Sequence, residues 1–290
     1  MRTDSRPEAV TRRRAAVPAW SYFAGSAVFH YLGPSFAVLL FARVAPLGVA
    51  GLRIWSAAIL FAAWRRPWRL LTGPDAAGRH LLVGWGLVLA LMNCCFYLAI
   101  SRLPLGTVAA IEYLPVIALA ALGARTPRNL AALVAAVGGV YVLTDVRLTG
   151  QPLGFVFAFA NAGLFAAYIM IAHRAARRSA SGVDGLAAAM LVAAVLVVPL
   201  GAWQSAPAFT DLVALGAGIG VGISSSVIPY VCDQLAMARM ARSTYALLVA
   251  LLPATATVIG VVVLRQIPSP AEIAGVGLVI AGVALHREPR

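Results

Sequence analysis

Residues 96–143 read FYLAISRLPLGTVAAIEYLPVIALAALGARTPRNLAALVAAVGGVYVL, in which three apolar runs are separated only by short loops. The middle run, residues 104–122, has about the 20 residues that a helix needs to cross a bilayer. Its apolar residues follow one another without the alternation that is typical of strands in a membrane β-barrel. The stretch therefore predicts consecutive membrane-spanning helices.

The same character extends along the whole chain of 290 residues. Hydrophobic residues make up 61% of it and charged residues 11%, with a mean hydropathy of +0.88. A soluble domain has roughly a quarter charged residues and less than half apolar ones. We therefore expect an all-α polytopic membrane protein with ten transmembrane helices. The ten apolar runs lie at about 18–41, 46–63, 79–100, 104–122, 129–143, 152–172, 185–203, 211–235, 243–264 and 270–286.

The distribution of basic residues predicts the orientation in the membrane. All 23 basic residues are Arg, and the net charge is +13. If the N-terminus lies in the cytoplasm, the inner segments hold 18 Arg and the outer loops hold four, with Arg53 at the start of the second span. This bias follows the positive-inside rule. Both termini are therefore expected in the cytoplasm, with residues 1–17 as a cytoplasmic tail, and the positive charge reflects topology rather than nucleic-acid binding.

The two halves of the chain repeat each other. Spans three to five align with spans eight to ten, and the coinciding pairs are Ala99/Ala236, Arg102/Arg239, Leu114-Pro115/Leu252-Pro253 and Gly139/Gly282. Because each half holds five spans, an odd number, the second half must be inverted relative to the first. Inverted repeats build many secondary transporters, whose substrate site lies near the midplane between the halves. We expect two five-helix repeats, residues 18–145 and 150–286.

Several segments resemble one known family. Residues 92–115, MNCCFYLAISRLPLGTVAAIEYLP, resemble bacterial threonine/homoserine exporters, which belong to the EamA group of the drug/metabolite transporter superfamily. Further similar segments are LRIWSA (52–57), PWRL (67–70), IPYVCDQLAMARM (228–240) and LLPATATVIG (251–260). The resemblance implies two inverted EamA repeats in a multi-pass protein of the bacterial cytoplasmic (inner) membrane. It also implies export of small metabolites, with amino acids as the leading class.

Two positions depart from those exporters. The exporters usually carry a Glu just before the Pro-Ala of span nine, where this chain has Leu252. They also carry a Gly-Glu near the outer end of that span, where this chain has Arg265 and Gln266. The Glu of span four is retained as Glu112. These departures bear on substrate selectivity more than on the fold.

Glu112 is the one carboxylate that we expect deep inside a span. An isolated ionised carboxylate is costly in a medium of low dielectric constant, and in membrane helices such residues usually face a cavity on a transport path. The alternative is a protonated Glu that only joins helices by a hydrogen bond. Tyr113 follows it, and Pro115 leaves the carbonyl of Ile111 without its helical donor, so a bent helix next to a cavity is expected.

Other polar residues inside the spans complete the predicted site. His30 could carry a coupling proton or make an interhelical hydrogen bond, and Asn93 and Asn161 could line a cavity or hold helices together. The predicted substrate-binding or coupling residues are Glu112, His30, Asn93, Tyr97, Tyr113, Asn161, Ser225 and Tyr230. The predicted helix breaks near the site are Pro34, Pro115, Pro229 and Pro253, since matched interruptions in two halves point to a binding region.

The function that these features favour is a secondary exporter working by alternating access, coupled to protons or moving solutes by exchange. Its expected partners are a small-molecule substrate such as threonine, homoserine or another zwitterion, the lipid bilayer and protons. The alternative is a drug or toxic-metabolite efflux transporter. An intramembrane enzyme is disfavoured, because residues 222–225 (GISS) lack the Gly-x-Ser-Gly context of intramembrane serine proteases. We expect no catalytic residues, cofactor, metal site or nucleic-acid partner.

Overall fold

The computed structural model describes residues 18–73, 75–123, 126–147, 151–176, 182–237 and 251–285. Throughout these ranges the regular structure is helical, without a strand, which confirms the predicted all-α class. The helices are α1 (Ala19–Leu40), α2 (Pro46–Arg65), α3 (Trp68–Leu71), α4 (Ala76–Ile100), α5 (Leu105–Gly123), α6 (Pro127–Arg147), α7 (Pro152–Ala176), α8 (Gly182–Leu196), α9 (Val198–Thr210), α10 (Leu212–Gly222), η1 (Ile223–Val227), α11 (Ile228–Met237), α13 (Leu252–Leu264) and α14 (Pro270–Leu285). The expected tail, residues 1–17, lies outside the described residues.

The helices follow the predicted apolar runs closely, with one interruption that the sequence analysis did not anticipate. The run at 185–203 forms two helices, α8 and α9, which are bent by 78° relative to each other. Pro199 stands in the first turn of α9 and has no N–H to continue the hydrogen-bond ladder of α8. Among the described residues, four helices are long and apolar enough to cross a membrane, or five if α8 and α9 form one bent span. The count of ten spans stays a prediction.

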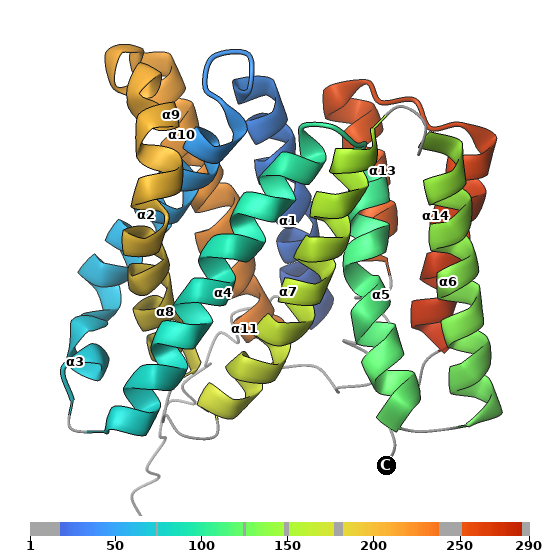
Figure 1. The fold of residues 1–290 in the computed structure, drawn as a ribbon, viewed down its shortest axis with the longest axis horizontal. Helices are drawn as coiled ribbons and strands as arrows, with labels where there is room; N and C mark the ends of the chain where they lie inside the picture. Colours follow the sequence, from blue (N-terminus) through green and yellow to red (C-terminus); the bar gives the residue numbers. More distant parts are fainter. Residues whose placement is uncertain are drawn as a thin grey trace, which may run out of the picture.

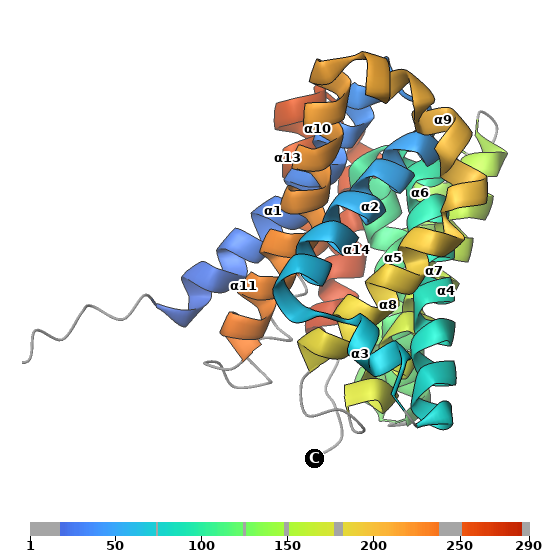
Figure 2. The ribbon, with the colours of Figure 1, turned by 90° about the vertical axis from the view of Figure 1, so that its left-hand side faces the viewer.

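The helices pack side by side in one bundle (Figure 1). α2, α8, α9 and α10 form a group at the left of the view, and α6 and α14 lie against each other at the opposite edge, beside α5 and α13. α1, α4 and α7 lie between these groups. Turning the molecule by 90° shows α1 beside α10 and α11 (Figure 2), in agreement with their packing contacts. α1 therefore brings the start of the chain against the second half.

Small residues allow α6 and α14 to approach closely. A Cβ built on Gly139 of α6 would lie 2.5 Å from the carbonyl oxygen of Gly275 on α14. One built on Gly282 of α14 would lie 2.7 Å from the carbonyl oxygen of Ala132. Close backbone contact through small residues is the usual way in which helices associate in membranes. Gly139 and Gly282, which the sequence analysis paired as coinciding positions of the two predicted repeats, both lie in this interface.

Large apolar side chains cover much of the outer surface. Trp203, Leu212 and Ile267 are each more than four-fifths exposed, and many Val and Leu residues accompany them. A soluble monomer rarely exposes large contiguous apolar patches. A lipid environment accounts for this surface, because lipid tails solvate apolar side chains without the cost that water imposes.

Candidate functional site

A five-residue π-helix, Ile223–Val227, joins α10 to α11. Ser224, Ser225 and Ser226 are buried within it. The Ser225 hydroxyl donates a hydrogen bond to the carbonyl of Val221 one turn earlier. π turns occur mostly as single turns inside α-helices, frequently at functional sites. Span eight is therefore interrupted at its serines, before the predicted break at Pro229.

α1 passes close to this π-helix because Gly33 has no side chain. A Cβ built on Gly33 would lie 2.5 Å from the Cβ of Ser225 and 2.8 Å from its backbone nitrogen. Seven residues earlier in α1, the Ser26 hydroxyl donates a hydrogen bond to the carbonyl of Pro229 over 3.3 Å. Any larger residue at position 33 would push α1 away from the serines.

Arg53 reaches the π-helix from α2. Its Nε donates to the Ser226 hydroxyl over 3.1 Å, and its Nη2 donates to the Ser225 carbonyl over 3.0 Å. Its guanidinium carbon lies 5.6 Å from the centroid of the Tyr97 ring on α4, in a cation–π contact. One side chain thus joins α2, α4 and the π-helix.

The position of Arg53 corrects the sequence analysis, which placed it at the start of the second span and gave it no role. It is the eighth residue of the 20-residue helix α2, about 10 Å along the axis from the first. An Arg inside a membrane helix is costly and usually marks a functional path. That signal was present in the sequence, because Arg53 stands alone inside the apolar run 46–63.

Glu112 of α5 is buried and held by Asn161 of α7. The Asn161 Nδ2 donates to Glu112 Oε1 over 3.2 Å. Asn161 is 0% exposed and Glu112 is 7% exposed. The structure therefore brings two of the predicted site residues, Glu112 and Asn161, into direct contact.

Three buried polar atoms around these residues lack a hydrogen-bond partner within the described ranges. They are the hydroxyls of Tyr31 and Tyr97 and the Oδ1 of Asn161, and the only other such atom in those ranges is the indole nitrogen of Trp85. The Tyr97 hydroxyl approaches Arg53 and Ser225, and the Tyr31 hydroxyl approaches Tyr113, without reaching hydrogen-bond geometry. Buried polar groups are normally satisfied, so such a concentration indicates a place that accepts further polar partners. We call this set the polar centre: Tyr31, Arg53, Tyr97, Glu112, Asn161, Ser225 and Ser226.

An apolar cavity of about 410 Å³ lies between α1 and α10, next to the polar centre. Its lining residues are Phe36, Leu39, Leu40, Arg43, Val213, Ala217, Gly220, Val221 and Ser224. Ser224 belongs to the π-helix, whereas Arg43 lies just beyond the end of α1. The cavity therefore follows the interface of α1 and α10 from the π-helix toward that end of the bundle.

Comparison with known proteins identifies the family. Two curated relatives are threonine/homoserine exporters named RhtA. The one from Escherichia coli (strain K12) is 32% identical over 256 residues, which cover 86% of this chain and 84% of that protein. The one from Salmonella typhimurium (strain LT2) is 31% identical over 270 residues, covering 89% of each. The EamA-like transporter family matches residues 152–287. The chain belongs to the EamA-like transporter family.

A solved crystal structure supports the fold of this EamA-like transporter. It aligns with a TM-score of 0.62 over 93% of this chain and 96% of the other, at 19% sequence identity. At that identity the likeness concerns the fold alone. The family assignment confirms the resemblance inferred from residues 92–115, and it places the chain among membrane transporters rather than enzymes.

The other predicted site residues of this EamA-like transporter divide into two groups. His30 contacts Tyr31 of the polar centre edge to face, with ring centroids 5.1 Å apart. Tyr113 is buried beside Glu112 in α5. Asn93, in contrast, donates to the carbonyl of Leu89 in its own helix over 2.8 Å and takes no part in the polar centre. Tyr230 lies in α11, but its side chain is outside the described part of the chain.

The four prolines predicted as breaks behave differently from one another. Pro34 and Pro115 lie inside α1 and α5, which continue past them. A proline removes one helical hydrogen bond, and neighbouring helices can satisfy the freed carbonyl. Pro229 follows the π-helix in α11, and Pro253 stands in the first turn of α13. The helix breaks that were expected at Pro34 in α1 and at Pro115 in α5 are therefore absent.

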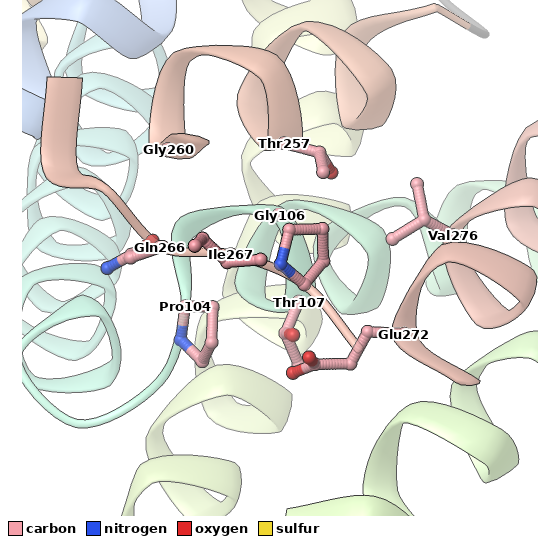
Figure 3. Close-up of a pocket in the computed structure, with 10 residues that line it drawn as sticks. Pro104, Gly106, Thr107, Thr257, Gly260, Gln266, Ile267, Glu272 and Val276 are labelled. Atoms are coloured by element: carbon pink, nitrogen blue, oxygen red, sulfur yellow. The ribbon is translucent and has the colours of Figure 1, made fainter. Parts of the chain in front are cut away.

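The departure at Arg265 and Gln266 has a structural explanation. Arg265 ends α13 in the left-handed conformation with φ 54°, and the Gln266 Oε1 accepts a hydrogen bond from the Leu105 N–H over 3.1 Å. Gln266 therefore satisfies an N–H at the start of α5, where helices leave such groups without an internal partner. It borders a small cavity of about 30 Å³ between α5, α13 and α14, with Glu272 on its other side (Figure 3).

Two ion pairs join the halves of the chain. Arg43 Nη1 lies 2.6 Å from Asp211 Oδ2, and Arg65 Nε lies 2.7 Å from Asp184 Oδ1. Asp211 also caps α10, and it accepts hydrogen bonds from two backbone N–H groups there. The hydrogen bond from Arg43, helped by these N–H groups, lowers the pKa of the Asp211 carboxyl.

Proposed function

We propose that this chain is a secondary exporter of threonine, homoserine or other small zwitterionic amino acids. It would act as a multi-pass protein of the bacterial cytoplasmic membrane with both termini inside. The exporters named above supply the substrate class, since they match along most of the chain. The observation that carries the proposal is the buried contact between Glu112 and Asn161, together with Arg53, which is hydrogen-bonded inside α2 to the buried serines of the π-helix.

An interior of this kind suits a small charged solute. Lipid and apolar side chains cannot stabilise an ammonium or a carboxylate, whereas the polar centre offers an acidic group, a cation and hydroxyls with spare hydrogen-bond capacity. Transport then follows by alternating access around this centre, as in other transporters built from repeats. Glu112 serves the substrate ammonium or a coupling proton, and His30 is the second titratable group near the centre.

Counterflow in proteoliposomes tests the proposal. Purified protein is reconstituted, vesicles are loaded with L-threonine, and the uptake of labelled L-threonine and L-homoserine is followed against protein-free vesicles. Uptake that depends on the protein and on the internal amino acid is expected. Protein that moves neither amino acid in either direction would contradict the proposal. Cysteine-accessibility labelling at residues 2 and 288 tests the topology, and external labelling of either would contradict it.

The efflux of apolar drugs is the second candidate, and the cavity between α1 and α10 favours it. Its lining is mostly aliphatic, with Phe36 and Leu39 also exposed toward the outside of the bundle. An apolar solute could enter there from the lipid. Competition decides between the two, because a drug transporter should move an apolar cationic dye and should not be inhibited by L-threonine.

A further inference from the structure

Arg53 and Glu112 carry opposite charges inside the bundle but do not neutralise each other directly. Within the described residues the ion pairs are Arg43–Asp211 and Arg65–Asp184, both away from the polar centre. Keeping a buried guanidinium and a buried carboxylate ionised without a counter-ion is costly in a low-dielectric interior. A ligand with one negative and one positive end would lower that cost at both sites at once.

The donors of Arg53 are only partly used. A guanidinium has five N–H groups, and the described contacts engage one at Nε and one at Nη2. Those two contacts fix the orientation of the guanidinium against the π-helix, and the Tyr97 ring contacts it as well. Apart from the approach of the Tyr97 hydroxyl, the described residues offer the guanidinium no acceptor at Nη1, so this end of the group can bind a carboxylate in the bidentate way that Arg favours.

The Tyr97 hydroxyl supplies a second, independent observation. Tyr97 is fully buried, its hydroxyl has no partner among the described residues, and it lies near both Arg53 and Ser225. A carboxylate seated on Arg53 would give this hydroxyl an acceptor. On the other side, the Asn161 amide holds Oε1 of Glu112 and thereby orients the carboxylate.

We infer that Arg53 binds the substrate carboxylate, with the Tyr97 hydroxyl beside it, and that Glu112 binds the substrate α-ammonium. This inference rests on the proposed function and adds the orientation of the substrate: its carboxylate lies toward α2 and the π-helix, and its ammonium lies toward α5 and α7. The class of ligand is a zwitterionic α-amino acid, and molecules that lack either charge bind weakly.

The test crosses ligand analogues with protein variants. L-Threoninol keeps the amine and side chain of L-threonine but replaces the carboxylate by an alcohol, and 3-hydroxybutyrate keeps the carboxylate but lacks the amine. Binding of each to purified full-length protein is measured by titration calorimetry or thermal shift. Wild-type protein should bind L-threonine about tenfold or more tightly than either analogue, since each loses a hydrogen-bonded charge contact.

The variants should then lose discrimination selectively. Arg53→Gln should bind L-threonine and L-threoninol about equally, yet still prefer L-threonine over 3-hydroxybutyrate. Glu112→Gln should bind L-threonine and 3-hydroxybutyrate about equally, yet still prefer L-threonine over L-threoninol. Arg102→Gln is the matched control, because Arg102 also makes a cation–π contact, over Phe157 at 5.3 Å, but lies outside the polar centre. It should keep both preferences.

The outcomes separate the inference from the proposed function. If Arg53 only holds the π-helix in place, Arg53→Gln weakens L-threonine and L-threoninol by the same factor, and the inference is overturned while the export function stands. If wild-type protein binds and moves neither L-threonine nor L-homoserine, the proposed function fails, and the inference fails with it. If Arg53→Gln does not fold, Arg53→Lys replaces it. That variant keeps the charge but not the bidentate fork. A smaller preference for L-threonine over L-threoninol, with the preference over 3-hydroxybutyrate kept, is expected, whereas an equal weakening of L-threonine and L-threoninol would overturn the inference.

Discussion

Replacing Glu112 by Gln tests the centre of the proposed transport path. Gln is nearly isosteric with Glu and keeps an oxygen where Asn161 Nδ2 donates over 3.2 Å. The lost part of that contact is the difference between a charged and a neutral hydrogen bond, about 1 kcal/mol. The free energy of unfolding should therefore change little, and Glu112→Gln should fold.

Transport should respond much more strongly. A hydrogen bond to a charged group contributes about 1.5–3 kcal/mol, so losing one to the substrate ammonium weakens binding roughly 10- to 150-fold at 1.4 kcal/mol per factor of ten. If Glu112 instead carries a coupling proton, Gln cannot titrate, and accumulation driven by a proton gradient disappears while exchange without a gradient survives. Comparing proton-driven flux with counterflow in proteoliposomes distinguishes these two roles.

A second buried carboxylate provides the control for this experiment. Glu272 accepts a hydrogen bond from the Ser269 N–H over 2.8 Å at the start of α14, a helix-capping contact that Gln can also make. Glu272→Gln should leave both fluxes near those of the wild type. Flux and pH dependence unchanged in Glu112→Gln would remove Glu112 from the mechanism, and His30 would then be the group to test for proton coupling.

Three further predictions use pairs of neighbouring or similar residues. Asn161→Ala should lower threonine counterflow about tenfold because it removes the hydrogen bond to the site carboxylate, whereas Asn93→Ala, whose contact lies within its own helix, should leave counterflow unchanged. Gly139→Ala should lower the midpoint of thermal unfolding, with a cost of about 1–3 kcal/mol from overpacking, whereas Gly138→Ala should not, because a Cβ there meets nothing within 4 Å. The pKa of the Asp211 carboxyl is lowered in the folded state. The ionised carboxylate therefore stabilises the fold above its unfolded pKa of about 3.9, and this stabilisation is lost as the pH falls through the folded pKa. Thermal unfolding of Asp211→Asn should depend less on pH in the acid range than thermal unfolding of the wild type.

Much of the fold could be predicted from the sequence because membrane helices carry a strong local signal. Residues such as Arg65 and Pro104 bound the long apolar runs, and α2, α4 and α7 match their predicted limits within a few residues. The bend between α8 and α9 was missed, because the run 185–203 is apolar on both sides of Pro199 and hydropathy does not report a change of direction. The π-helix was missed for a similar reason, since ISSSV has no pattern that separates an α turn from a π turn.

The site was harder to predict because it depends on contacts between distant segments. Glu112 could be found from its own position, as a charge inside an apolar run. Its partner Asn161 could be named but not distinguished from Asn93, because both are single amides in apolar helices and only the packing of α5 against α7 selects one of them. Arg53 was assigned to the membrane boundary because basic residues were counted for topology, where an Arg near a span end is ordinary.

The ion pairs Arg43–Asp211 and Arg65–Asp184 lie where the proposed transport cycle would open and close the bundle. Arg43 precedes α2 and Arg65 ends it, so the pairs with Asp211 and Asp184 lie at opposite ends of a 20-residue helix, about 30 Å apart. Each pair joins the first half of the chain to the second. If the halves rock about the polar centre in the proposed alternating access, one pair opens while the other stays closed. Because exposed ion pairs contribute little to stability, either end can open without a large barrier, whereas the buried contacts of Arg53 and Glu112 stay at the pivot.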